Sequence, residues 1–238
     1  MTLLYGKAVL NEKVVYIEQC SFYSGHDKCD FNLRLTHVMD HQTFNFFMTQ
    51  FGEPTMNFHQ SVFNSYMTFV ASYGDVLTFV ILTIMTSIVL IVKKYYVFAL
   101  WILGTVAGGG ILGILLKNVL HRHRPYDHLL NDSGFSFPSG HSLSSTMIAL
   151  LLLMVFIPKI HRTILRRSAI IIVTVLWVSI LFSRLYFHAH FISDVLGGTS
   201  LGLLWVTVSL TLYNRLHLYF HHLKWLAHGK IFKVNVNI

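Results

Sequence analysis

Long apolar stretches constrain this chain more than any other feature of its sequence. Five of them approach the length that a membrane-spanning helix needs, about 20 mostly apolar residues. They are Val76–Val92, Tyr95–Leu116, His141–Ile157, Ser168–Phe187 and Ile192–Tyr213. Strands of a membrane barrel would be about 10 residues long with alternating polarity, and these stretches show neither property. The sequence therefore predicts an all-α, polytopic transmembrane helix bundle with about five spans.

The composition excludes the other broad classes of protein. Only 12% of the 238 residues are charged, against about 25% in a typical soluble protein, and 54% are hydrophobic. A soluble fold of this size exposes too much surface for so few charges, and a disordered chain would be rich in charge and poor in apolar residues. Two cysteines in a chain this long also exclude a small disulfide-stabilised scaffold.

The formal net charge of +8 would suit a nucleic-acid-binding protein, so the positions of the charges decide its meaning. The basic residues lie in short tracts between the apolar stretches, which is typical of membrane loops and not of a nucleic-acid-binding face. Ten cations and no acid fall in alternate tracts: Lys93, Lys94, Lys159, Arg162, Arg166, Arg167, Arg215, Lys224, Lys230 and Lys233. An excess of Lys and Arg marks the cytoplasmic side, so we expect the opposite ends of the spans to face outside and no nucleic-acid partner.

The first 75 residues differ from the rest because they carry four cations and seven anions and no long apolar run. The aromatic tracts Phe44–Phe51 and Phe58–Val70 suit an interfacial amphipathic helix, and a buried satellite helix is the alternative. Cys20 and Cys29 are either a disulfide, if this region lies outside, or free thiols. We predict four regions: an N-terminal tail (1–39), an interfacial amphipathic segment (40–75), a transmembrane core (76–214) and a basic cytoplasmic tail (215–238).

Three polar clusters lie at span ends on the predicted outer side, where ionisable residues are functional candidates. The clusters are Lys117–Pro125 (KNVLHRHRP), Phe137–Ser142 (FPSGHS) and Ser183–Asp194 (SRLYFHAHFISD). Singly, such residues are often structural: an arginine at a helix end extends to the interface, and Pro-Ser-Gly forms a turn and cap. Their joint occurrence on one side, in spans that otherwise avoid charge, favours a functional site.

The chemistry of the clusters points to a phosphate ligand. Lys117, Arg124 and Arg184 are three cations at one side of the membrane, and arginine presents a planar fork that matches phosphate oxygens. Ser139 and Gly140 stand at a predicted helix start, where backbone N–H groups and the helix dipole favour an anion. These five residues are the predicted phosphate-binding set.

The histidines supply the parts of a phosphoryl-transfer reaction. His190 and Asp194 are four residues apart and so share one face of a helix, where the carboxylate can orient the imidazole. His141 stands beside the predicted anion site as a second proton-transferring group. A nucleophile, its orienting acid, a general acid and an anion clamp together form a complete set.

The three clusters resemble the signature motifs of the type 2 phosphatidic acid phosphatase superfamily of lipid phosphate phosphatases. The family pattern is K-x6-RP, then PSGH, then SR-x5-H-x3-D, and every signature position and spacing matches. The resemblance implies a metal-independent lipid phosphatase or diphosphatase without a cofactor, in which His190 forms a phosphohistidine, Asp194 activates it and His141 protonates the leaving oxygen. It also implies that Lys117, Arg124, Ser139, Gly140 and Arg184 hold the phosphate.

The resemblance further implies a multi-pass enzyme of the bacterial cytoplasmic membrane, with its active site at the outer face and a phosphorylated lipid as partner. Phosphatidic acid, phosphatidylglycerophosphate and undecaprenyl diphosphate are all implied as substrates. Family members usually have six spans, so the sequence predicts either a five-span variant or an altered start. The sequence does not indicate an oligomeric state.

Two alternatives stay open at this point. A metal-dependent hydrolase could use the pairs His121–His123 and His188–His190 with Asp194, although histidines two apart on a helix point to different faces. A lipid transporter or lipid-binding protein would place its polar groups nearer the middle of the bilayer, on broken helices.

Overall fold

The structure is a computed structural model that describes residues 31–125, 134–221, 229–232 and 234. Its chain forms two compact units, Met1–Gln42 and Thr43–Ile238, and helix α2 (Phe31–Phe51) runs through their boundary. Cys20 and Cys29, and with them the predicted choice between disulfide and free thiols, lie outside the described residues.

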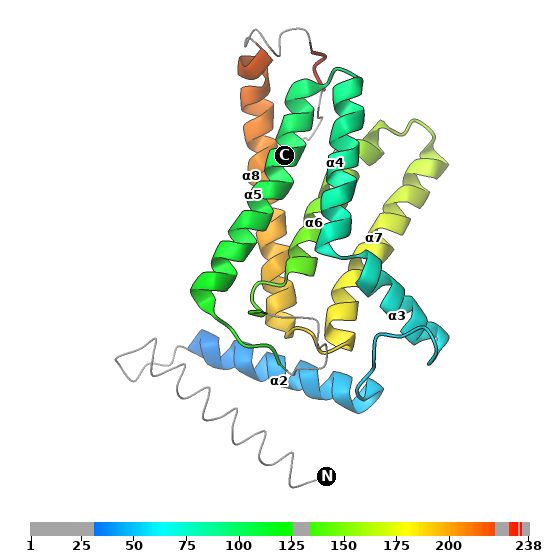
Figure 1. The fold of residues 1–238 in the computed structure, drawn as a ribbon, viewed down its shortest axis with the longest axis vertical. Coiled ribbons are helices and arrows are strands. Elements are labelled where there is room, and N and C mark those ends of the chain that lie inside the picture. The colour runs from blue at the N-terminus through cyan, green and yellow to red at the C-terminus, as the bar shows by residue number, and fades with distance from the viewer. Residues whose placement is uncertain (1–30, 126–133, 222–228, 233, 235–238) are drawn as a thin grey trace. The chain divides into compact units, whose positions relative to one another are not determined.

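The second unit is built from helices, and the described residues contain no strand, which confirms the all-α prediction. Helix α6 (Gly140–Leu151) continues to Lys159 through a π-helical segment (Leu152–Phe156) and a 3-10 turn (Ile157–Lys159). After the end of α2, the helices are α3 (Val62–Tyr73), α4 (Val76–Val92), α5 (Tyr96–Leu120), α6 (Gly140–Leu151), α7 (Thr163–Tyr186) and α8 (Ile192–His221) (Figure 1).

The number of candidate spans agrees with the sequence prediction. Four helical stretches of the described chain are long and apolar enough to cross a membrane: Tyr96–Leu120, Gly140–Lys159, Thr163–Tyr186 and Ile192–Leu216. Helix α4 has 17 residues and rises only about 26 Å, which is short for a span. It becomes the fifth candidate when α3, which meets it at a bend of 55°, is counted with it.

Helix α6 lies at the centre of the bundle. It packs against α4, α5 and α7, and most extensively against α8. Its apolar stretch is 56% buried, against 17% for α7. Two glycines of α8 permit the close packing: a Cβ on Gly198 would lie 2.5 Å from the carbonyl oxygen of Ser139, and a Cβ on Gly202 would lie 3.0 Å from Thr146. The start of α6 is therefore enclosed by residues from its neighbours.

The second half of α2 and helix α3 form a smaller aromatic cluster with α7. Phe47 is buried, and its ring centroid lies 5.2 Å from that of Phe182. Tyr186 donates a hydrogen bond of 3.1 Å to the buried side-chain oxygen of Asn64. Phe46 and Phe69 remain exposed, so both aromatic tracts have a buried and an exposed side. The predicted interfacial role of residues 40–75 stays a prediction.

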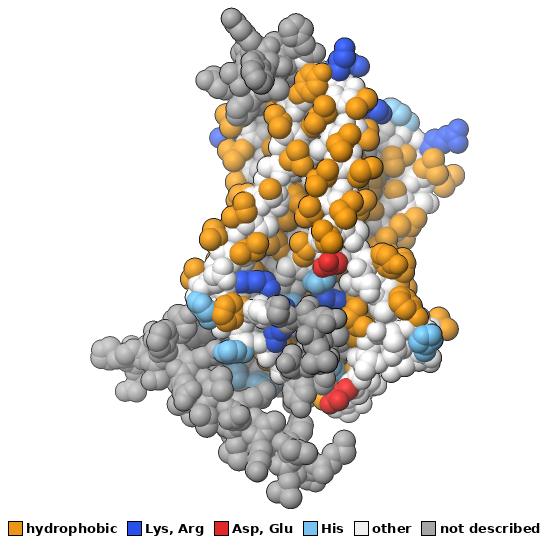
Figure 2. Space-filling view, viewed as in Figure 1, with side chains coloured by type: hydrophobic (Ala, Val, Ile, Leu, Met, Phe, Trp, Pro, Cys, Tyr) orange, Lys and Arg blue, Asp and Glu red, His pale blue; other side chains and the backbone are white. Residues whose placement is uncertain are grey.

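The basic loops meet at the end of the bundle away from the start of α6. The backbone N–H of Lys230 donates to the carbonyl oxygen of Lys94 at 2.7 Å, and the Lys159 ammonium lies 4.2 Å from the ring centroid of Phe232. The α4–α5 turn, the end of the α6 stretch and the C-terminal segment are thereby joined. Figure 2 shows hydrophobic side chains over the helices between the two ends, with Lys, Arg and His side chains gathered toward the ends.

Candidate active site

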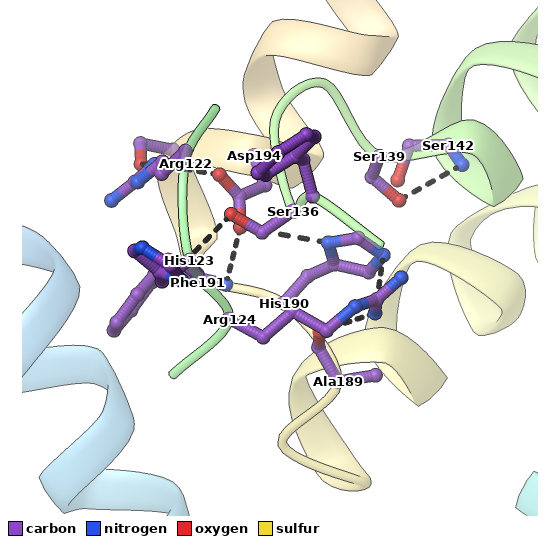
Figure 3. A network of polar contacts seen from close by, with 12 residues as sticks. Arg122, His123, Arg124, Ser136, Ser139, Ser142, Ala189, His190, Phe191 and Asp194 are labelled. Carbon is purple, nitrogen blue, oxygen red and sulfur yellow. Dashed lines mark hydrogen bonds and ion pairs between the residues drawn. The ribbon is translucent and has the colours of Figure 1, made fainter. Parts of the chain in front are cut away.

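The three polar clusters of the sequence meet at one end of the bundle, where α5 and α7 end and α6 and α8 begin (Figure 3). The loop between α7 and α8 carries His190. It is tied to the end of α7 because the carbonyl oxygen of Arg184 accepts the backbone N–H groups of Ala189 at 3.0 Å and of His190 at 3.3 Å. A short loop between two packed helices thus gives His190 a defined position.

His190 faces Asp194, although the predicted shared helix face is wrong, because His190 lies in the loop just before α8 and only Asp194 lies on the helix. His190 Nδ1 lies 3.5 Å from Asp194 Oδ2, at the long limit for a hydrogen bond, and both side chains are almost fully buried. The other ring nitrogen, Nε2, lies 3.4 Å from Arg124 Nη1. A carboxylate at Nδ1 leaves Nε2 as the nitrogen directed toward a ligand, which is the arrangement a histidine nucleophile requires.

Asp194 is held by groups other than His190. It stands in the first turn of α8, where the helix dipole favours a negative charge. Its Oδ2 accepts the backbone N–H of Phe191 at 2.9 Å, and its Oδ1 accepts Arg122 Nη1 at 2.6 Å. These contacts fix the direction of the carboxylate.

The surroundings of His190 favour its neutral form. Burial lowers the pKa of His190 from 6.5 to about 4, because an imidazolium loses the hydration that water would give it. Asp194 acts in the opposite direction, while the positive charges of Arg124 and Arg184 lower the pKa further. The imidazole is therefore unprotonated at neutral pH, as a nucleophile must be.

Arg124 and Lys117 donate hydrogen bonds to backbone carbonyl groups of the loops before α6 and α8. Arg124 donates to the carbonyl oxygens of Ala189 at 2.9 Å and Gly134 at 3.2 Å, and Lys117 Nζ donates to that of Phe135 at 2.8 Å. Arg124 thus lies near His190, and its predicted role in holding phosphate stays a prediction. Lys117 is brought to the same connecting segment, where its role in holding phosphate stays a prediction.

Arg184 joins the remaining two clusters. It is a fully buried arginine near the end of α7, and its Nη1 lies 3.2 Å from His141 Nε2. Its charge also acts on His190. One guanidinium therefore lies close to both histidines that the sequence singles out.

At the start of α6, Ser139 caps the helix and the backbone of Gly140 remains open to a ligand. Ser139 is buried, its hydroxyl accepts the backbone N–H of Ser142 at 3.4 Å, and its own N–H donates to the carbonyl oxygen of Asp194 at 3.1 Å. The side chain of Ser139 thus serves the helix here, and its predicted contact with phosphate is untested. At Gly140 an added Cβ would meet only Val76, at 3.7 Å, so the backbone stays approachable.

Comparisons with known proteins agree with this geometry. The sequence matches the PAP2 superfamily over residues 98–218, about half of the chain. The chain belongs to the PAP2 superfamily. Phosphatidylglycerophosphatase B of Bacillus subtilis is 38% identical over 98 residues, which are 40% of this chain and 47% of that protein. The crystal structure of a transmembrane PAP2-type phosphatidylglycerolphosphate phosphatase from Bacillus subtilis superposes with a TM-score of 0.58 at 26% identity, covering 76% of this chain and 88% of that one.

The PAP2 match confirms the family resemblance, and the solved relative confirms the transmembrane helical fold. The sequence match spans about half the length of the curated relative, so the activity of the whole protein belongs with the proposals below. All three signature motifs lie within the matched range.

Two residues of this PAP2 site were not among the predicted site residues. Arg122, inside the first cluster, contacts Asp194 Oδ1 and also Ser193 Oγ at 2.6 Å. Asp75, in the break between α3 and α4, lies with its Oδ1 3.1 Å from His141 Nε2. The only sequence signal for Arg122 was its place inside the first cluster, and Asp75 gave none beyond its position before an apolar stretch.

The metal alternative finds no support in this arrangement. In the described part of the chain, no three His, Cys, Asp or Glu side chains come together in a way that could hold a metal ion. The ring of His121 packs on Phe135 with centroids 4.4 Å apart, and that of His188 lies 5.1 Å from Phe44. These two histidines therefore contact aromatic rings.

Proposed function

We propose that the protein is a membrane lipid phosphate phosphatase that works through a phosphohistidine on His190. The observation that carries this is the orientation of one buried imidazole, with Nδ1 toward Asp194 and Nε2 toward Arg124. A nucleophilic nitrogen beside a phosphate-binding guanidinium is what attack on phosphorus requires.

In the first step, His190 Nε2 attacks phosphorus, a P–N bond forms and the P–O bond to the lipid breaks. The leaving oxygen takes a proton from His141. The positive charge that develops on the His190 ring is stabilised by Asp194, whose carboxylate lies at the other ring nitrogen.

In the second step, water attacks the phosphorus while His141 takes up its proton. The P–N bond breaks, inorganic phosphate leaves, and both histidines return to their starting states. Lys117, Arg124, Arg184 and the N–H groups at Gly140 offset the negative charge on the phosphoryl oxygens throughout, which is why the proposal needs no metal ion.

The proposed substrate is phosphatidylglycerophosphate, because the similar curated sequence and the similar solved structure are both named for its hydrolysis. Phosphatidic acid and undecaprenyl diphosphate present the same reacting group on a lipid and are the competing substrates. We further propose that the site faces outside the cytoplasmic membrane, since it lies at the end of the bundle opposite the basic loops.

The test is phosphate release by the purified protein in detergent from each of the three lipids, with excess chelator present. We expect release to continue in chelator and kcat/KM to be highest for phosphatidylglycerophosphate. Release that stops in chelator and returns with added metal would support the metal-dependent alternative. Binding of the lipids without any release would support a transport or binding protein.

The intermediate is tested with substrate carrying a radioactive phosphoryl group. After rapid quenching in alkali, the labelled protein should carry an acid-labile, alkali-stable phosphate, as a phosphohistidine does. The variant His190→Gln should carry none and should release no phosphate. The matched control is His161→Gln, which changes an exposed histidine beyond the far end of α6 and should behave as the parent protein.

A further inference from the structure

A bend in the chain brings an acid from outside the PAP2 motifs to the active site. Asp75 occupies the break between α3 and α4, where the two helices meet at 55°. Gly74 makes this bend possible, because a Cβ there would clash with the carbonyl oxygen of Val70 and would lie 2.7 Å from Ile180 of α7. The tight packing of the bend on α7 fixes the place of Asp75.

The carboxylate of Asp75 meets His141 at one ring nitrogen. Asp75 Oδ1 lies 3.1 Å from His141 Nε2, and the side chains are 43% and 16% exposed. Arg184 Nη1 lies 3.2 Å from the same nitrogen. A carboxylate accepts a hydrogen bond and so favours a proton on Nε2, whereas a guanidinium only donates and so favours a bare Nε2.

Other charged groups around the start of α6 do not replace Asp75. They are Lys117 at the end of α5, Arg184 at the end of α7, and His190 and Asp194 around the start of α8. Arg184, whose Nη1 lies 3.2 Å from His141 Nε2, opposes a proton on His141. Asp194 already receives Arg122, and its carboxylate faces His190. Asp75 is therefore the carboxylate in position to favour the charged form of His141.

We propose that Asp75 is a positioning residue that keeps His141 protonated and directed for donation to the leaving oxygen, a role that rests on the proposed function. In the resting enzyme, His141 Nε2–H donates to Asp75. When substrate binds, the leaving oxygen takes the proton from this nitrogen as the P–O bond breaks. Arg184 then stabilises the unprotonated ring, which is ready to take a proton from water in the second step.

The test compares Asp75→Asn with the parent protein on two substrates whose leaving groups differ. The alkoxide of phosphatidic acid needs a proton to leave, while the phenolate of p-nitrophenyl phosphate does not. We expect kcat/KM for phosphatidic acid at pH 8 to fall about tenfold or more, and for p-nitrophenyl phosphate to fall less than about twofold. The alkaline limb of the phosphatidic acid profile should move about one pH unit lower.

A purely structural role for Asp75 would give a different result. Equal losses on both substrates with an unmoved alkaline limb would overturn the proposal. Asp75→Glu, which restores the charge, should recover part of the lost activity. Glu53→Gln is the matched control, because it removes an exposed carboxylate outside the site and should change neither the profile nor the substrate ratio.

A second measurement does not depend on turnover. The protonation of His141 can be followed by NMR in histidine-labelled protein, with its signal assigned by its loss in His141→Gln. The titration midpoint should fall by about one pH unit in Asp75→Asn, and an unchanged midpoint would overturn the proposed pairing. A parent protein that hydrolyses no phosphate ester would refute the proposed function, and the NMR result would still decide the interaction between Asp75 and His141.

Discussion

Two histidines at one end of this molecule each face an aspartate, but in contrasting surroundings. His190 and Asp194 stand four residues apart, and their side chains are 2% and 0% exposed. His141 and Asp75 come from different elements, and their side chains are 16% and 43% exposed. The same two residue types thus form one local buried pair and one distant, half-exposed pair.

The difference matches what each histidine must do in the proposed reaction. Exclusion of water favours a neutral His190, and a neutral imidazole is the nucleophilic form. A histidine that gives a proton in one step and takes one in the next needs access to water and a balance between its two protonation states. The half-exposed pair with its nearby arginine meets that need, so burial separates the roles of two chemically identical side chains.

Removal of the buried carboxylate of Asp194 should have the largest effect on activity. In Asp194→Asn the ring of His190 loses the negative charge at Nδ1, and the amide can also hold the wrong tautomer. We expect kcat/KM for phosphate release to fall about 10³- to 10⁴-fold. Thermal unfolding in detergent provides the check that the variant remains folded. A loss below about tenfold in a folded variant would mean that Asp194 does not orient a nucleophile.

Replacement of His141, the histidine of the more exposed pair, should have a smaller and substrate-dependent effect. His141→Gln retains a polar side chain but cannot donate a proton to the leaving oxygen. We expect kcat/KM for phosphatidic acid to fall about 10²- to 10³-fold, and for p-nitrophenyl phosphate to fall less than about tenfold. Identical losses on the two substrates, measured by phosphate release at one pH, would contradict a general acid role.

The sequence predicted the buried pair because its partners are only four residues apart, although the chain brings them together through the loop before α8 and not on one helix. It predicted the spans because apolar stretches of membrane length are a local property of the chain. The clustered motifs also indicated that Arg124 and Arg184 belong to the site, and each lies near one of its histidines, while their phosphate contacts stay predictions. In all these cases the signal is contained in a short segment.

The half-exposed pair could not be predicted in the same way, because it depends on packing between distant segments. Asp75 reaches His141 through the bend at Gly74, and no periodicity in the sequence predicts that bend. Ser139 shows the same limit: its cap on α6 was an alternative that the sequence offered, but the bond from its backbone N–H to the carbonyl oxygen of Asp194 was not. The contact between Ser139 and Asp194 follows from how closely α6 and α8 approach each other.

Loss of the contact between Arg122 and the buried pair should lower activity by an intermediate amount. Arg122→Gln removes the charged partner of Asp194 Oδ1, so the carboxylate and the ring of His190 lose their fixed direction. We expect kcat to fall about 10- to 100-fold with KM nearly unchanged, because Arg122 acts through Asp194 and not on the substrate. Arg122→Lys keeps the charge without the planar fork and should recover only part of the loss. A large rise in KM would instead place Arg122 among the phosphate-binding residues.

The smallest expected change concerns acid pH and distinguishes the two histidines most directly. Burial lowers the pKa of His190 to about 4, so its nucleophilic form should persist as the pH falls below 6.5 and be lost only near pH 4. We expect kcat/KM, corrected for the ionisation of the substrate phosphate measured separately by phosphorus NMR, to stay within about twofold between pH 5 and pH 6.5. Because the negative charge of Asp194 raises the pKa of His190, the residual activity of Asp194→Asn should extend to a still lower pH. A corrected acid limb near pH 6.5 in the parent protein would mean that His190 titrates like a histidine in water, and the contrast between the buried and the half-exposed pair would then have no consequence for the chemistry.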